Sequence, residues 1–336
     1  GMIAARKTAE ALAILKQFGR FEEQGTLPNM IRGNDAANRD TSDAPLWFIL
    51  ACDDLIRADN TDDLLDADCA GRSLREIILS IGRSYMAGTT NGIRVDPESG
   101  LVFSPAHFSW MDTDFPAGTP RQGYPIEIQA LWYAALRLLA RVDSPEHQQN
   151  WQHLATKVQT SLMNLFRQND LAYLSDCLHA SAGESAARAV PDDALRPNQL
   201  LAITLGAVND DHICHGILTA CETLLVPGAI RSLADRPVVH PIEIVHQGNI
   251  INHPHHPYQG KYSGDEDTSR KPAYHNGTAW TWPFPSFCEA WASTYGEKSR
   301  ETALAWLGSG VRLLSQGCLG HLPEILDGDF PHTPRG

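Results

Sequence analysis

The sequence FSWMDTDFPAGTPRQGYPIEIQALWY, residues 108–133, joins a loop rich in proline, glycine and aromatic side chains to the start of an apolar helix. Asp112 lies in the loop, and Glu127 lies in the first turn of a helix that we expect over 126–142. Loops carry binding and catalytic residues more often than regular elements do. The stretch therefore predicts a chain of helices whose connecting loops hold the functional side chains.

Apolar residues recur at helical spacing along most of the chain. Short and long connections alternate between these segments, so we expect the long loops to gather at one end. Strand patterns are weak, with one small hairpin expected from 92–95 and 100–104 and another over 237–246. The sequence thus predicts a single all-α domain over residues 1–336. The nine predicted helices cover residues 4–19, 43–58, 72–88, 126–142, 145–168, 197–208, 210–224, 277–295 and 297–315.

Composition excludes several classes of protein. The chain has 336 residues, and a net charge of −13 from 27 basic and 40 acidic residues argues against a nucleic-acid partner. No apolar run approaches the ~20 residues of a membrane helix, and the N-terminus lacks a signal-peptide pattern. We therefore expect no membrane partner and a cytoplasmic location. Seven cysteines without a CxxC pair predict buried, reduced thiols rather than disulfides or a zinc site. The oligomeric state stays open.

A second carboxylate-bearing loop is HLPEILDGDFPHTPRG, residues 321–336. It carries Glu324, Asp327 and Asp329 among proline and glycine residues. Two carboxylates brought together from distant loops are what cleavage of a glycosidic bond requires. The alternative for each acidic residue is a structural role, such as capping a helix.

The loop before residue 126 offers further groups for a sugar site. Trp110 has a broad flat face for a sugar ring, and a carboxyl beside it, such as Asp112, tends to have a raised pKa that suits a general acid. Arg121 supplies a forked donor for hydroxyls or a carboxylate, and the helix dipole favours the charge of Glu127. On the alternative interpretation, Asp112 and Glu127 are caps and Trp110 is a core residue.

Two further helix starts carry polar and aromatic groups. The sequence YHNGTAWTWPFP, residues 274–285, places Tyr274, His275 and Trp280 where they either bind sugar or pack a helix start. Asp43 is predicted to be the N-cap of the helix over 43–58, a role that is compatible with facing a pocket.

Histidines cluster in HQGNIINHPHHPY, residues 246–258. No cysteine or carboxylate pattern with known ligand spacing accompanies them. We therefore expect a loop with incidental histidines, no metal site and no cofactor.

Several motifs occur together in an order that resembles the C-terminal glucosidase domain of glycogen debranching enzymes. The resemblance extends from about residue 20 to the end of the chain. The motifs are NRDTSDAPLWF, SWMDTDFPAGTPRQGYPIEIQALWY, RPNQLLAITL, LLVPGAIRSL, AYHNGTAWTWPFPSF and PEILDGDFPHTPRG.

The resemblance implies an (α/α)6 barrel and an amylo-α-1,6-glucosidase that releases glucose from branch points with inversion. Asp112 in SWMD matches the general acid, and Glu324 in PEILDGD matches the general base. An inverting pair is expected to stand about 6.5–9.5 Å apart. The residues that match pocket-lining positions are Asp43, Glu127, Tyr274, His275 and Trp280.

The sequence also departs from the family pattern. A full barrel has twelve helices, an N-terminal motif for the terminal glucose and a closing helix, so we expect helices to be missing at one or both ends and apolar faces to be exposed. One alternative is therefore an inactive relative or subunit piece that only binds α-glucan. Another is a hydrolase of a different α-glucoside, such as trehalose.

Overall fold

The computed structural model describes residues 1–33, 35–113, 119–318 and 320–335. Ten α-helices occur in these ranges, together with short strands, so the protein is mainly helical. The described chain forms two compact units, which we treat one at a time. The predictions of a single domain and of a closed barrel stay predictions.

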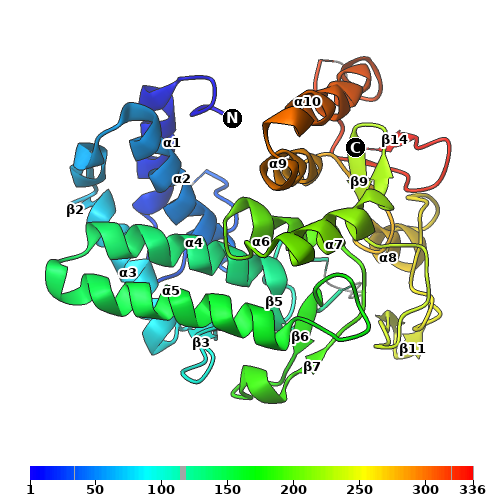
Figure 1. Ribbon diagram of the computed structural model, residues 1–336, viewed down its shortest axis with the longest axis horizontal. Helices are drawn as coiled ribbons and strands as arrows, with labels where there is room; N and C mark the ends of the chain where they lie inside the picture. The colour runs from blue at the N-terminus through cyan, green and yellow to red at the C-terminus, as the bar shows by residue number, and fades with distance from the viewer. Residues whose placement is uncertain (34, 114–118, 319, 336) are drawn as a thin grey trace. The chain divides into compact units, whose positions relative to one another are not determined.

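The first unit comprises Gly1–Trp110, Gln122–Ser161 and Ala180–Arg188. Helix α2 packs against α1 and α4, and α3 also packs against α4 (Figure 1). Its helices are α1 (Thr8–Gly19), α2 (Ala44–Asp59), α3 (Leu74–Ala87), α4 (Ile126–Val142) and α5 (Pro145–Leu165), whose last four residues belong to the second unit. Its strands are β1 (Asp68–Cys69), β2 (Arg72–Ser73), β3 (Arg94–Val95), β4 (Val102–Phe103) and β5 (Gly123–Pro125).

Local signals set the helix ends in this unit. The Ser73 hydroxyl accepts a hydrogen bond from the Glu76 N–H, and the Glu76 carboxylate accepts one from the Ser73 N–H, which is a capping box at the start of α3. Asn60 ends α2 in the left-handed conformation.

Helix α4 is the core of the first unit and is buried along most of its length. The Trp132 indole donates to the Gly100 carbonyl at 3.2 Å and lies 5.7 Å from the Tyr85 ring. The Gln129 amide pairs with the backbone of Val102, donating to its carbonyl at 2.9 Å and accepting from its N–H at 2.7 Å. These contacts hold α4 in place, and Glu127 lies in the first turn of this helix.

The second unit comprises Met111–Arg121, Leu162–His179 and Ala189–Gly336. Helix α9 packs against α6, α7 and α10. Its helices are α6 (Leu200–Thr204), α7 (Asp211–Glu222), α8 (Lys271–Tyr274), α9 (Phe284–Tyr295) and α10 (Arg300–Ser309). Its strands are β6 (Cys177–His179), β7 (Val190–Pro191), β8 (Leu225–Val226), β9 (Ala229–Arg231), β10 (Val245–His246), β11 (Asn249–Ile250), β12 (Ala279–Trp280), β13 (Ile325–Leu326) and β14 (Pro334–Arg335).

An antiparallel sheet in the second unit corrects the all-α prediction. Five strands join in the order β14-β13-β12-β9-β8. The helix predicted from residue 277 begins at Phe284 instead, because Ala279 and Trp280 pair with strands on both sides. The prediction of a helix before residue 284 was wrong because apolar and aromatic runs suit a buried strand as well as a helix.

Other predicted elements have mixed outcomes. The hairpin from 92–95 and 100–104 is confirmed by the β3–β4 pairing. The hairpin over 237–246 is wrong, because β10 pairs with β11 further along the chain. The helices over 197–208 and 297–315 are shorter, with 3-10 turns at 197–199, 297–299 and 310–315.

Exposure differs from expectation at one cysteine. Six cysteines are buried, as predicted, whereas Cys318 is exposed. Large apolar side chains at helical spacing are also exposed along α10 and the turn after it. They are Leu304, Leu307, Val311 and Leu314. Exposed apolar helix faces were expected from the sequence.

Candidate functional site

The two carboxylates predicted to catalyse both belong to the second unit and are exposed. Asp112 lies in an irregular segment that follows Met111, which is fully buried. Glu324 directly precedes β13, and its carbonyl accepts the Thr281 N–H at 3.3 Å. The β12–β13 pairing therefore fixes the backbone of Glu324 beside the aromatic sequence that contains Trp280.

Tyr274 connects the two carboxylates electrostatically. Burial raises the pKa of the Tyr274 hydroxyl, a hydrogen bond from this hydroxyl to the Glu324 carboxylate raises it further, and the negative charge of Asp112 adds to the effect. The structure therefore brings Asp112, Tyr274 and Glu324 into one neighbourhood.

Aromatic rings surround Tyr274. Its ring centroid lies 4.7 Å from that of Trp280, 4.9 Å from that of His275 and 5.5 Å from that of Tyr262. The rings of His275 and Trp280 stack at 5.2 Å with an interplanar angle of 16°. Since both rings are buried, their main visible role is to build the wall that holds Tyr274.

Thr113 ties the loop of Asp112 to this aromatic wall. Its hydroxyl lies 2.9 Å from Nδ1 of His275. His275 is 1% exposed, so the ring is a rigid anchor for the residue that follows Asp112. Sequence reasoning missed Thr113 and Tyr262, because neither residue type signals such a contact before the loops are brought together.

Asp43 and Glu127 meet in the first unit. Burial raises the pKa of Asp43 to about 6, and the charge of Glu127 contributes to the rise against a lowering hydrogen bond from Thr41. Asp43 is the N-cap residue of α2 by position, but its side chain makes no capping bond. The Thr41 hydroxyl instead accepts the Ala44 N–H at 3.1 Å and donates to Asp43 at 2.6 Å. The predicted capping role of the Asp43 side chain is therefore wrong.

The remaining predicted residues have different settings. Trp110 is the last residue of the first segment of the first unit. Its side chain is half-buried, so it is not a fully buried core residue. Arg121 is buried in the second unit, where its Nε donates to the Asp176 carboxylate at 2.7 Å. Arg121 is thus engaged by a buried acid, which sequence reasoning did not identify.

The other acidic residues of the 321–336 loop have structural contacts. Asp327 accepts from the Arg335 guanidinium at 2.7 Å and from the Tyr262 N–H at 2.8 Å. Asp329 accepts from the Tyr258 hydroxyl at 2.9 Å. These bonds hold the loop in place, and Glu324 is the acidic residue of this loop that remains exposed and is a candidate for catalysis.

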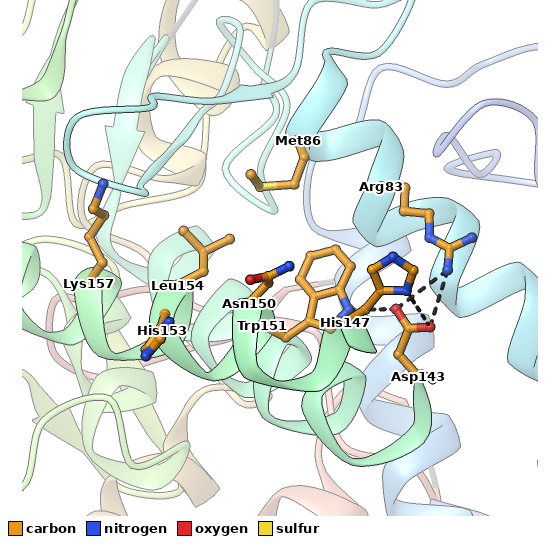
Figure 2. A pocket seen from close by; sticks show the side chains of 9 residues that line it. All are labelled: Arg83, Met86, Asp143, His147, Asn150, Trp151, His153, Leu154 and Lys157. Atoms are coloured by element: carbon orange, nitrogen blue, oxygen red, sulfur yellow. Dashed lines mark hydrogen bonds and ion pairs between the residues drawn. The ribbon is translucent and has the colours of Figure 1, made fainter. Parts of the chain in front are cut away.

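A hollow of about 520 Å³ lies on the first unit between α3 and α5 (Figure 2). Asp143 lies at one end and accepts from the Trp151 indole at 2.7 Å and from Arg83 at 3.2 Å. Although burial acts in the opposite direction, these bonds and the Ser144 N–H hold the pKa of Asp143 below its usual value. The hollow contains none of the predicted site residues.

Neither a cluster of metal-binding side chains nor a membrane-spanning helix occurs in the described ranges. No group of three or more His, Cys, Asp or Glu side chains in residues 1–33, 35–113, 119–318 and 320–335 could hold a metal ion. Within the same ranges, every helix is too short or too polar to cross a membrane. In the histidine-rich tract, the His253 and His256 rings pack edge to face at 5.1 Å.

Comparison with known proteins gives one family match and a similarity of fold. The model of a family described as Amylo-alpha-1,6-glucosidase matches residues 1–242 and 249–336. A search of curated proteins gives no match. Among solved structures, the chain is similar to a rhamnosidase from Klebsiella oxytoca with rhamnose bound, at 13% identity and a TM-score of 0.54. The similarity covers 93% of this chain and 47% of the rhamnosidase, so this chain spans about half of that length. At this identity the likeness concerns the fold.

Proposed function

Because the chain belongs to the amylo-alpha-1,6-glucosidase family, we propose that it is an inverting glycoside hydrolase. Its substrates would be α-1,6 branch points of glycogen-like glucans, from which it releases glucose. Its helices would form part of an (α/α)6 barrel. Cleavage would need no metal or organic cofactor, since two carboxyl groups supply the proton transfers.

In this mechanism Asp112 is the general acid and Glu324 is the general base. The Asp112 carboxyl gives its proton to the glycosidic oxygen as the bond to the anomeric carbon breaks. The Glu324 carboxylate takes a proton from a water molecule, whose oxygen attacks that carbon from the opposite face. Glucose of inverted configuration and a shortened glucan leave, and an exchange of protons with water restores both carboxyl groups.

The observation that carries this proposal is the neighbourhood of Tyr274, with its hydrogen bond to Glu324 and the charge of Asp112 nearby. A hydroxyl that donates to a carboxylate fixes its orientation without protonating it, because the pKa of the hydroxyl is raised. This arrangement suits a base that must remain ionised while it orients a water. His275 and Trp280 would hold Tyr274 and border the glucose.

The other predicted residues would contribute the remaining contacts to the sugar. Trp110 would offer a flat face, and Asp43 with Glu127 would accept hydrogen bonds from hydroxyl groups. Arg121 would act through its buried contact with Asp176, as part of the wall of the binding site.

The direct test is glucose release from a branched limit dextrin. We expect Asp112→Asn and Glu324→Gln each to reduce kcat by at least a hundredfold, because general acid and base catalysis contribute about 10²–10⁴-fold each. The matched controls Asp63→Asn and Glu301→Gln change exposed carboxyls elsewhere and are expected to retain full rate. Wild-type turnover in both catalytic variants would refute the assignment.

The same assay separates the alternatives. Binding of limit dextrin without glucose release, unchanged by both substitutions, would identify a glucan-binding relative. Release of glucose from trehalose or another α-glucoside, but not from the dextrin, would identify a different substrate.

A further inference from the structure

A cavity of about 530 Å³ lies in the second unit, and Arg121 is part of its lining. Its polar and charged lining comes from Thr119, Arg121, His179, Asp192, Arg196, His240 and Glu243. None of Asp112, Tyr274 and Glu324 lines it. Its volume is within the range of about 300–1,000 Å³ that is typical of small-molecule sites.

The buried charges of this cavity already compensate one another. Arg121 and Arg196 flank Asp176, with Nε–carboxylate distances of 2.7 and 3.6 Å. Asp192 accepts from the Asp176 N–H at 2.8 Å and lies 3.0 Å from Nε2 of His179. A charged ligand would meet no excess of opposite charge among these buried groups, and burying its charge would be costly. Glu243, the other charged residue of the lining, is exposed to solvent. The cavity therefore suits a neutral ligand.

One buried polar group of the lining has no partner in the described ranges, and a second polar group lies beside the cavity. Oγ1 of Thr119 has no hydrogen-bond partner, although the side chain is only 2% exposed. The half-buried ring of His240 also lines the cavity. Burial and the neighbouring His179 lower the pKa of His240, so its ring is neutral at pH 7 and offers one donor and one acceptor. Since buried polar groups are normally satisfied, the Thr119 hydroxyl indicates a ligand with hydroxyls, to which the neutral His240 ring can also hydrogen-bond.

The lining also has a flat face. The His179 and His240 rings stack at 4.2 Å with an interplanar angle of 14°. Ile242 and Val245 add apolar surface beside them. A flat, partly apolar wall with a few polar groups matches the two aspects of a sugar ring, its C–H face and its hydroxyl rim.

Arg196 joins this cavity to the candidate catalytic site. Its guanidinium donates to the His275 carbonyl and to the Asn276 side chain. The ring of His275 contacts Thr113, the residue after Asp112. The cavity is therefore linked to the segment that follows Asp112, which also supplies Thr119 and Arg121 to the lining, and Asp112 is the proposed general acid that protonates the leaving oxygen.

We propose that this cavity binds a neutral glucosyl residue of the substrate on the leaving side of the cleaved bond. This assignment rests on the proposed glucosidase function. It makes Thr119 and His240 binding residues for the glucan chain that carries the branch.

The test measures equilibrium binding by calorimetry in the Glu324→Gln background, which prevents turnover. The probes are maltotriose carrying one α-1,6-linked glucose, glucose alone, and glucuronate. Thr119→Val and His240→Phe are each expected to weaken binding of the branched tetrasaccharide about fivefold or more, because one hydrogen bond contributes about 1 kcal/mol. Binding of glucose is expected to stay unchanged.

Thr294→Val is the matched control, because the Thr294 hydroxyl is also buried without a partner but does not line the cavity. Thermal unfolding checks that the Thr119→Val variant folds. If that variant does not fold, the binding measurement on His240→Phe, which keeps a stacking ring, tests the assignment instead. Unchanged or undetectable binding of the tetrasaccharide, or a preference for glucuronate, would overturn the assignment. Glucose release by the unmodified chain is measured separately, so weakened binding without any release would refute the glucosidase function and leave a glucan-binding cavity.

Discussion

The hydroxyl of Tyr274 donates a hydrogen bond to the carboxylate of Glu324. Tyr274 ends the short helix α8, whereas Glu324 lies 50 positions later in the chain, directly before β13. The β12–β13 pairing carries Glu324 back to the aromatic wall around Tyr274. The sheet that sequence patterns missed is thus the element that assembles this contact.

Tyr274→Phe tests whether the hydroxyl positions Glu324. A hydrogen bond to a charged group contributes about 1.5–3 kcal/mol. We expect kcat for limit dextrin to fall by about ten- to a hundredfold, with a smaller change in KM, in steady-state kinetics. Tyr262→Phe removes a hydroxyl from a neighbouring ring and serves as the control. Equal effects of both substitutions would show that Tyr274 acts only through packing.

Asp43→Asn tests the buried acidic pair of the first unit. A folded-state pKa of about 6, above the ordinary value of 3.8, means that Asp43 favours the folded state below about pH 4 and loses this contribution as pH rises through 6. We expect Asp43→Asn to raise the free energy of unfolding by up to about 3 kcal/mol at pH 8 and to change it little at pH 4. Urea unfolding at pH 4, 6 and 8 measures the difference.

Glu127→Gln provides the companion measurement, since the charge of Glu127 is one cause of the raised pKa of Asp43. In the Glu127→Gln background, the gain from Asp43→Asn at pH 8 is expected to shrink. A gain that is independent of pH would contradict the electrostatic explanation.

Arg121→Met tests the buried network behind the proposed sugar site. Removing one partner of a buried ion pair costs about 3–5 kcal/mol when the remaining charge is uncompensated, and Arg196 at 3.6 Å still offsets part of the charge on Asp176, so we expect a cost near the lower end of that range. We expect a loss of this size in urea unfolding. Arg141→Met is the comparison, because the Arg141–Asp53 pair at 2.7 Å is partly exposed and is expected to contribute at most about 1 kcal/mol. Similar losses for both variants would rule out a special role of burial.

Gly328→Ala tests the close approach within PEILDGD. A Cβ at this position would lie 2.0 Å from the Gly277 carbonyl oxygen, a distance that requires the backbone to move. We expect lower thermal stability and loss of the Glu324 geometry, seen as reduced glucose release. Gly308→Ala in α10 meets nothing within 4 Å and is expected to stabilise by up to about 1 kcal/mol. Full activity of Gly328→Ala would contradict this packing argument.

The helical part of the fold was predictable because its signals are local. The apolar period of 126–142 matches α4, and the hairpin from 92–95 and 100–104 is present. Predictions failed where pairing between distant segments decides the structure. Ala279 and Trp280 form a strand only because β9 and β13 lie on either side, and no local pattern encodes that.

The candidate site divides in the same way. Residue type and motif order singled out Asp112 and Glu324 and the residues around Tyr274. They could not reveal that Thr41 caps α2 in place of Asp43, or that Arg121 is engaged by Asp176. Each of these contacts depends on side-chain directions that are set only once the backbone is folded.

The sequence alone determined that this chain is mainly helical, that its loops carry the candidate carboxylates, and to which family it is similar. Tertiary structure decided which acidic residues are available. Asp327 and Asp329 are bound by Arg335 and Tyr258, whereas Glu324, three residues before Asp327, is exposed and meets Tyr274. The physical reason is that a carboxylate's chemistry depends on its neighbours in space, and antiparallel pairing brings together residues that the sequence separates.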